Sequence, residues 1–256
     1  MERIESEKNS HIRRLVRLRR PRDRHRLGQF LIEGLRECHR AAENGWELLE
    51  LYGTSAVFAQ ALPPCREAFL LPDKLFGKIS ARENPDGLLA TAAIRQCPLP
   101  QSLPPNALVI VAEAMEKPGN LGAILRSAEA AGCQLLLLAD PLTDVWNPNA
   151  IRASQGAIFA VPLAICTGEA AIRFLRENGV GIVAAAPAAE RCYWDSLPGG
   201  SIAIAIGNEH GGLSGRWLRE ADLTVRIPME GSTSDSLNAS VAAALLLYEA
   251  LRTRRR

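Results

Sequence analysis

The sequence predicts an α/β protein with two domains, the second of which holds a mostly parallel sheet with helices on both faces. Five continuous apolar runs have the composition of strands buried on both faces. Stretches with helical periodicity alternate with them, which is typical of parallel sheets. The strands are expected at 107–112, 134–139, 179–186, 201–206 and 223–227, and the helices at 121–131, 149–157, 169–178, 215–220 and 236–252.

Four prolines between residues 98 and 105 mark a boundary between the domains. Proline resists both helix and sheet, so this stretch is expected to form a stiff linker. We place the first domain at 1–100, the linker at 101–105 and the second domain at 106–256. The first domain alternates short strands and helices, which predicts a small α/β sandwich. Its expected elements are a helix through 15–18, a strand at 29–32, and apolar segments at 48–52 and 69–71.

Positive charge is concentrated near the N-terminus, although the formal net charge is only +2. Eight arginines and a single acidic residue, Asp23, lie between 13 and 26. Clustered arginines release counterions when they neutralise phosphates, so this segment predicts a nucleic-acid partner, with a solvated helix face as the alternative. A second cluster at 252–256 is interpreted as a solvated tail. The candidate RNA-binding residues are Arg13, Arg14, Arg17, Arg19 and Arg20.

The six cysteines and four histidines are dispersed along the chain. None has the spacing of metal ligands, so no metal site is predicted. The sequence also contains no apolar stretch of membrane-spanning length and opens with no signal segment. We therefore expect a reduced, cytoplasmic protein without membrane contact.

A polar segment at 116–127 follows the first strand of the second domain, where α/β folds bind ligands. Asn120 is a candidate site residue, or else the cap of the next helix. Arg126 lies in an otherwise apolar helix and needs an anionic partner, either a phosphate or a structural carboxylate. The segment lacks a G-x-G-x-x-G fingerprint, which argues against a nicotinamide-dependent oxidoreductase.

Two further polar segments follow later strands. The segment 207–214 contains three glycines, which indicate tight turns, and Glu209, which is either a site residue or a helix cap. The segment 227–238 leads into the last helix. Ser236 is expected to cap that helix, and Asn238 to lie in its first turn.

Together the three segments resemble the signature motifs of the SpoU (TrmH-like) branch of the SPOUT RNA methyltransferases. The motif N-x-G-x-x-x-R is matched by Asn120, Gly122 and Arg126. The motif G-x-E-x-x-G is matched by Gly207, Glu209 and Gly212. The motif I-P-M…S-L-N is matched by Ile227, Pro228, Met229, Ser236, Leu237 and Asn238.

The first domain resembles the L30e-like substrate-binding module of that family, through segments 30–34 and 84–90. Two positions depart from the family pattern. Lys117 stands where an acidic residue is expected, and the third motif is one residue longer between Gly231 and Ser236.

The resemblance implies a SPOUT fold with a deep trefoil knot, a homodimer, and transfer of a methyl group from S-adenosylmethionine to a ribose 2′-hydroxyl in RNA. The implied catalytic residues are Asn120, Arg126, Glu209, Ser236 and Asn238. The implied cofactor-binding residues are Gly207, Ile227, Met229 and Leu237.

Arginine is the catalytic residue of the family and is often described as a base. Deprotonating an arginine near neutral pH costs roughly 7 kcal/mol. We therefore favour Arg126 as an electrostatic clamp on an RNA phosphate. The L30e-like module favours ribosomal RNA as the substrate. Transfer RNA and a non-catalytic RNA-binding role are the alternatives.

Overall fold

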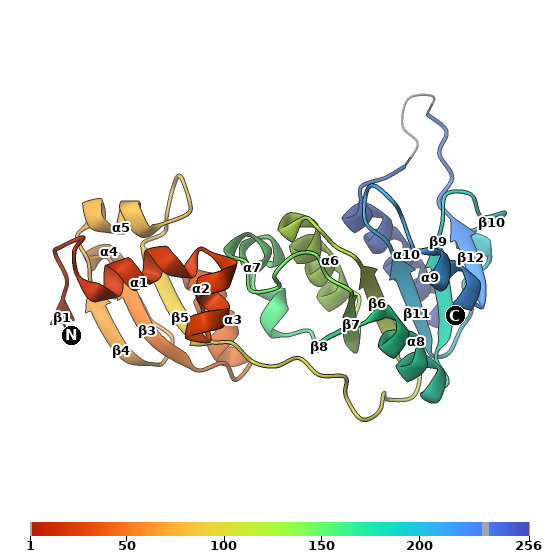
Figure 1. The fold of residues 1–256 in the computed structure, drawn as a ribbon, viewed down its shortest axis with the longest axis horizontal. Coiled ribbons are helices and arrows are strands. Elements are labelled where there is room, and N and C mark those ends of the chain that lie inside the picture. Colours follow the sequence, from red (N-terminus) through yellow and green to blue (C-terminus); the bar gives the residue numbers. More distant parts are fainter. Residues whose placement is uncertain (1, 232–235, 256) are drawn as a thin grey trace. The chain divides into compact units, whose positions relative to one another are not determined.

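The computed structural model describes residues 2–231 and 236–255, and it divides the chain into two compact units (Figure 1). The first unit contains the residues up to 96 together with 144–160, and the second contains 97–143 and 161–256. The proline-rich stretch lies in a segment without helix or strand, from 94 to 107. The domain limits at 100 and 106 remain predictions. The segment 144–160, which the sequence analysis places in the second domain, is grouped with the first unit.

The first unit is the small α/β fold expected from the sequence. Its strand β5 (Leu88–Ala93) runs antiparallel to both neighbours, whereas the other pairs are parallel. The sheet order is β1 (Glu2–Arg3), β4 (Cys65–Leu70), β3 (Leu48–Gly53), β5 and β2 (Gln29–Glu33). The helices are α1 (Ser10–Leu18), α2 (Pro21–Leu27), α3 (Leu35–Glu43), α4 (Ser55–Phe58), α5 (Asp73–Ile79), α7 (Pro148–Ser154) and the 3₁₀ turn η1 (Ala157–Phe159).

Helix α1 is amphipathic, and this explains why an arginine-rich segment folds. Ile12, Leu15 and Leu18 recur every three residues and are buried, so the arginines between them face outward or toward the helix flanks. The Asn9 side chain accepts a hydrogen bond from the backbone N–H of His11 and caps the helix.

The segment 144–160 is built into the core of the first unit. Trp146 stacks on Phe30 with ring centroids 4.6 Å apart. Arg24 is fully buried, and its Nε donates to Asp144 Oδ2 at 2.7 Å. This arginine therefore serves the fold rather than a surface partner.

The second unit contains a seven-stranded sheet in which every pair is parallel. All five expected strands are present. The two additional strands, β10 and β8, form the edges of the sheet, where short strands carry little hydrophobic signal. The order is β10 (Arg191–Cys192), β12 (Leu223–Arg226), β9 (Gly181–Ala185), β11 (Ile202–Ile206), β6 (Leu108–Glu113), β7 (Leu135–Ala139) and β8 (Leu163–Cys166).

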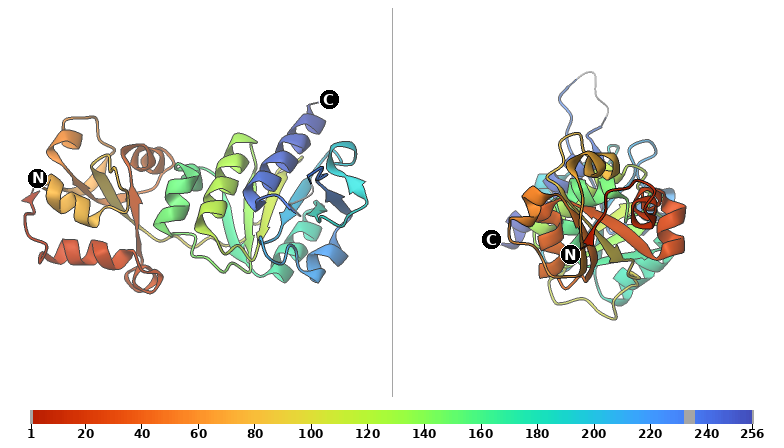
Figure 2. Two further views of the ribbon diagram at one scale, coloured as in Figure 1. Left: turned by 90° about the horizontal axis from the view of Figure 1, so that it is seen from above. Right: turned by 90° about the vertical axis from the view of Figure 1, so that its left-hand side faces the viewer.

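Helices cover both faces of this sheet. On one face α6 (Pro118–Ala130) and α10 (Ala239–Arg254) lie side by side, and α10 contacts β6 and β11 (Figure 2). On the other face, alternate residues of the central strands join one apolar core with α8 (Gly168–Glu177) and α9 (Gly215–Glu220). A 3₁₀ turn, η2 (Tyr193–Asp195), precedes β11. Across the described residues, no helix combines the length and the apolar character that crossing a membrane requires.

Candidate active site

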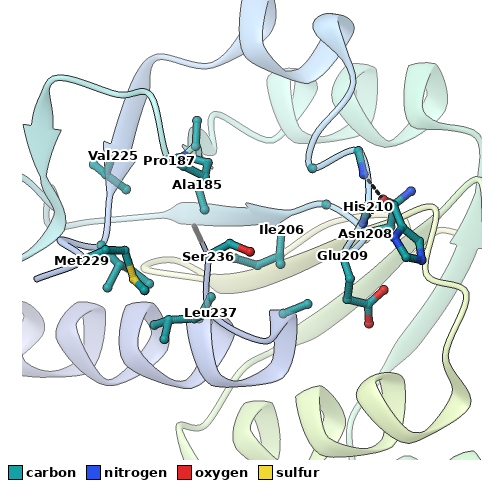
Figure 3. Close-up of a pocket in the computed structure, with 17 residues that line it drawn as sticks. Ala185, Pro187, Ile206, Asn208, Glu209, His210, Val225, Met229, Ser236 and Leu237 are labelled. Atoms are coloured by element: carbon teal, nitrogen blue, oxygen red, sulfur yellow. Dashed lines mark hydrogen bonds between the residues drawn. The ribbon is translucent and has the colours of Figure 1, made fainter. Parts of the chain in front are cut away.

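A cavity of about 420 Å³ lies at the carboxyl ends of the neighbouring strands β9, β11 and β12 (Figure 3). Residues that follow these three strands line it, together with the start of α10. Its apolar wall is formed by Ala185, Pro187, Ile206, Val225 and Leu237. The cavity therefore occupies the place where parallel sheets bind ligands, as the sequence predicts.

The second motif forms one side of the cavity, with residues 207–212 all lining it. A Cβ atom on Gly207 would lie 1.9 Å from the carbonyl carbon of Gly212, so only glycine fits at 207. Asn208 folds the loop, because its Oδ1 accepts hydrogen bonds from the backbone N–H groups of His210 (3.0 Å) and Gly211 (2.7 Å). The loop thus presents backbone rather than bulky side chains to the cavity.

Glu113 holds the far end of this loop. It is the last residue of β6, and its side chain lies beside the loop rather than in the cavity lining. Its Oε2 accepts from the backbone N–H of Ser214 at 2.7 Å, and its Oε1 accepts from the hydroxyl of Ser214 at 2.6 Å. Ser214 is also the residue before α9, so the alternative of Glu209 as the cap of that helix is wrong.

Glu209 lines the cavity at the end opposite Met229 (Figure 3). Both carboxylate oxygens are buried, and neither has a hydrogen-bond partner among the described residues. A buried carboxylate without partners is costly, so this end of the cavity favours a cationic or hydrogen-bond-donating ligand.

The third motif supplies the remaining wall. Ile227, Met229, Ser236 and Leu237 all line the cavity. Residues 232–235 lie outside the described part of the chain, and with them the extra residue predicted in this motif.

Asn238 joins the third motif to the first. Its Nδ2 donates to Asn120 Oδ1 at 3.1 Å, and its own Oδ1 accepts from the backbone N–H of Ser240 at 2.9 Å. Asn238 is therefore the N-cap of α10, so the prediction of Ser236 as the cap is wrong. Asn120 lies inside the first turn of α6, which begins at Pro118, so its alternative role as a helix cap is also wrong.

Arg126 lies outside the cavity lining. Its side chain is exposed, and its guanidinium forms no hydrogen bond or ion pair with the residues that the structure describes. The alternative of a structural carboxylate as its partner is therefore wrong for the described residues, because Arg126 projects from the solvent-facing side of α6 while Leu125 and Ala128 face the core.

The five candidate RNA-binding arginines divide into free and engaged side chains. Arg14 is engaged: its guanidinium donates to Glu50 Oε2 at 2.5 Å and to the Tyr52 hydroxyl at 2.9 Å. Burial alone would raise the pKa of Glu50, but hydrogen bonds from Arg14 and Thr91 outweigh it and hold that pKa below its ordinary value. These bonds engage the Arg14 guanidinium within the first unit, and its role in RNA binding stays a prediction.

The other four candidates are exposed. Arg19 donates to the carbonyls of Ile79 and Ser80, and Arg17 donates to Asp23 at 3.3 Å. The guanidinium groups of Arg13 and Arg20 contact no hydrogen-bond or ionic partner within 2–231 and 236–255. Among the five candidates, these two are best placed to take an external phosphate.

The sequence predicts that the C-terminal arginines form a solvated tail. At least one of them instead contacts the body of the second unit. Arg254 donates to the carbonyls of Asn106 (2.8 Å), Ala107 (2.8 Å) and Gly200 (2.7 Å). Burial lowers the pKa of its guanidinium from the ordinary value. The interpretation of this cluster as solvated is therefore wrong for Arg254, which anchors the end of α10.

Two family models match the chain in the expected order. The SpoU rRNA Methylase family matches residues 107–248, and the MRM3-like substrate binding domain matches residues 9–90. The chain belongs to the SpoU rRNA methylase family. The resemblance and the fold class predicted from the three motifs are thereby confirmed.

Two related 23S rRNA methyltransferases align with nearly the whole chain. The 23S rRNA (guanosine(2553)-2'-O)-methyltransferase RlmP of Bacillus subtilis is 28% identical over 97% of this chain and 98% of its own. The 23S rRNA (uridine(2479)-2'-O)-methyltransferase of Streptomyces viridochromogenes is 31% identical over 90% of this chain and 85% of its own.

Solved structures agree with these relatives. An RNA 2'-O ribose methyltransferase, 40% identical, matches with a TM-score of 0.86 over 99% of this chain and 100% of its own. The SpoU methyltransferase AviRb from Streptomyces viridochromogenes, in complex with the cofactor AdoMet, is 29% identical and matches with a TM-score of 0.84 over 96% and 98%.

Three parts of the SpoU site in this chain escape reasoning from sequence. Asn208 occupies a variable position of its motif, yet it shapes the loop. Glu113 ends an apolar run, and that lone carboxylate at a strand's carboxyl end is the available signal. The wall at 185–187 carries small and apolar residues, which give no chemical signal before the strand order is known.

Proposed function

We propose that this chain transfers a methyl group from S-adenosylmethionine to a ribose 2′-hydroxyl in ribosomal RNA. One observation carries the proposal. Residues of the second and third motifs enclose one cavity, and a hydrogen bond between Asn120 and Asn238 ties the first motif to its edge. Named relatives that act on 23S rRNA, over nearly the same length of chain, support the substrate class.

The cavity fits S-adenosylmethionine. Ile206, Ile227 and Leu237 offer apolar faces for an adenine ring, and Met229 adds a deformable side chain at the rim. The bare backbone at 207–212 offers N–H and carbonyl groups to the polar parts of the cofactor. When bound, the cofactor supplies an electrophilic methyl group on a positively charged sulfur. The unpaired Glu209 carboxylate suits a cofactor that carries positive charge.

The ribose hydroxyl needs help to act as a nucleophile, and we assign that help to residues of the motifs. Arg126 is exposed and has no partner in the described part of the chain, so it is free to bind an RNA phosphate and to orient the ribose beside it. Ser236 lines the cavity and offers a hydroxyl, while Asn238 and Asn120 fix the start of α10 relative to α6. In this scheme the phosphate or a water molecule accepts the proton, and Arg126 stays charged.

The first unit would hold the RNA. Arg13 and Arg20 are the primary contacts in this proposal, with Arg17 and Arg19 in support, because the guanidinium groups of the first pair have no partner among the described residues. Arg14 is left out of the RNA-binding set, because Glu50 and Tyr52 hold its side chain.

Further properties implied by the family are part of the same proposal. We propose a trefoil knot in the second unit, and a homodimer formed through that unit. Exposed apolar side chains along α10 (Val241, Leu245 and Tyr248) support the subunit contact. A ribosomal RNA substrate would place the enzyme in the cytoplasm.

Mapping of 2′-O-methyl groups tests the function. Ribosomal and transfer RNA from cells with and without the gene would be compared, and the purified protein would then be incubated with each unmodified RNA and radiolabelled S-adenosylmethionine. A single ribosomal site that disappears with the gene and is restored by the protein is expected. Loss of a transfer RNA site would instead favour that substrate, and RNA binding without cofactor binding would identify a non-catalytic member of the fold.

A further inference from the structure

Loop 207–214 depends for its position on a residue outside all three motifs. We propose that Glu113 is a positioning residue, which holds this loop in the conformation that binds S-adenosylmethionine. The inference rests on the proposed function, because it concerns the affinity of the same cavity for the same cofactor.

The place of Glu113 in the sheet carries the argument. In the parallel pairing of β6 with β11, Ala112 lies opposite Ile206, so Glu113 lies level with Gly207, where the loop begins. The residue is 6% exposed, although it is charged and ends a strand. Both of its oxygens are directed at one residue, Ser214, at 2.7 and 2.6 Å.

Leu213 packs into the apolar core beneath the sheet, but the other hydrogen bonds of the loop shape it without tying it to a strand. The Asn208 side chain binds the N–H groups of His210 and Gly211, and the Asn208 carbonyl accepts from Gly212 at 3.1 Å. All these partners belong to the loop itself. The two hydrogen bonds that Ser214 donates to Glu113 tie the far end of the loop to the end of a neighbouring strand, within the part of the chain that the structure describes.

Small movements of that far end would alter the cavity. Gly207 and Gly212 approach so closely that no side chain fits between them, and both line the cavity. A shift of Ser214 would be transmitted through Leu213 to Gly212, and from there to the backbone groups around the cofactor. Glu113 can therefore set cofactor affinity without touching the cofactor.

The chemistry of the pair explains why a carboxylate is needed. Ser214 presents two donors, its backbone N–H and its hydroxyl, and a carboxylate can accept both at once. Glutamine keeps one acceptor oxygen and so preserves the bond to the N–H, with a neutral in place of a charge-assisted bond. Alanine removes both bonds and leaves the N–H and the hydroxyl of Ser214 without their protein acceptor.

Isothermal titration of S-adenosylmethionine into the full-length protein tests the proposal. We expect Glu113→Ala to weaken cofactor binding about 30-fold, and Glu113→Gln and Ser214→Ala to weaken it about fivefold each. Ser214→Thr keeps both donors and should bind within about twofold of the unmodified protein. In steady-state assays the loss should appear in the KM for the cofactor, with kcat at saturation nearly unchanged.

Asp222→Ala provides the matched control. Asp222 likewise accepts a backbone N–H, that of Ile182 at 2.7 Å, and it also pairs with Arg176. It directly precedes β12 and lies beside Ile182 near the amino end of β9, outside the cavity lining. This variant should lower the unfolding temperature and leave cofactor affinity unchanged.

The outcomes separate the two levels of inference. If the unmodified protein fails to bind S-adenosylmethionine, the proposed function fails. If it binds and Glu113→Gln binds equally well, the positioning role is overturned, and this milder variant decides the matter should Glu113→Ala not fold. Equal loss of affinity in Asp222→Ala would also overturn it, since general destabilisation would then explain the effect.

Discussion

Two buried carboxylates, one in each unit, differ in their hydrogen-bond partners. Glu50 of the first unit accepts hydrogen bonds from Arg14 and from the hydroxyl of Thr91. Glu209 of the second unit has both oxygens buried and no partner among the described residues. Since an unpaired buried charge costs several kcal/mol, a fold keeps one only where something outside the chain compensates it. The difference indicates that Glu50 serves stability and Glu209 serves a ligand.

The arginines repeat this contrast. Arg14 is held by Glu50 and Tyr52, whereas Arg126 is exposed and without a partner in the described structure. Glu209 and Arg126 of the second unit thus lack partners among the described residues, while Glu50 and Arg14 of the first unit pair with each other. Substitutions on the two sides should therefore have opposite signatures, in catalysis or in stability.

The largest effect is expected for Arg126. Arg126→Ala should slow methyl transfer about 1000-fold, because it removes the cation proposed to hold the RNA phosphate. The unfolding temperature of the variant should stay the same, since Arg126 forms no hydrogen bond or ion pair with the residues that the structure describes. Single-turnover methylation and thermal unfolding would measure the two properties.

Arg126→Lys keeps the charge and loses the two-pronged geometry, so it should also be slow. Methylation by the lysine variant at the rate of the unmodified protein would contradict the clamp. Arg14→Ala is the matched control, with lower stability and a rate per folded molecule close to normal.

A smaller effect is expected for Glu209. Glu209→Gln should reduce methyl transfer about 100-fold, by removing the charge that faces the cofactor. The same variant should be at least as stable as the unmodified protein without ligand, because it removes an uncompensated buried charge. A loss of stability in calorimetry without ligand would show that Glu209 has an internal role after all.

A feature of the fold or of the site could be predicted from the sequence where the residues that determine it are close together in the chain. The five inner strands of the second unit could be predicted because each is an apolar run. The strands β8 and β10 could not, because they are short edge strands with half-exposed residues. The motif residues of the cavity could be predicted because each follows a strand. The division between Arg13 and Arg14 could not, because it depends on Glu50, which lies 36 residues away from Arg14 on another element.

The placement of the segment 144–160 also depends on contacts with residues that are distant in the sequence. Its composition gives no reason to group it with the first unit, and the reason lies in Arg24 and Phe30, more than a hundred residues earlier. The exposed face of Arg126 was missed because apolar neighbours along a helix do not reveal which side meets the sheet. In each case the missing information is a contact between distant parts of the chain.

The smallest effect concerns the pH dependence contributed by Glu50. Its pKa in the folded protein lies below the ordinary value of 4.5, because the hydrogen bonds from Arg14 and Thr91 outweigh the effect of burial. A lowered folded-state pKa stabilises the fold above pH 4.5, and this stabilisation is lost as the pH falls through the folded-state value. Glu50→Gln keeps the shape of the side chain and cannot titrate, so it should cost about 2 kcal/mol at pH 7 and progressively less below pH 4.5. Urea unfolding of both proteins between neutral and acidic pH measures this difference. Stability curves that stay parallel over the whole range would mean that the Arg14–Glu50 contact contributes no charge-dependent stability, and the contrast with Glu209 would then lose its first half.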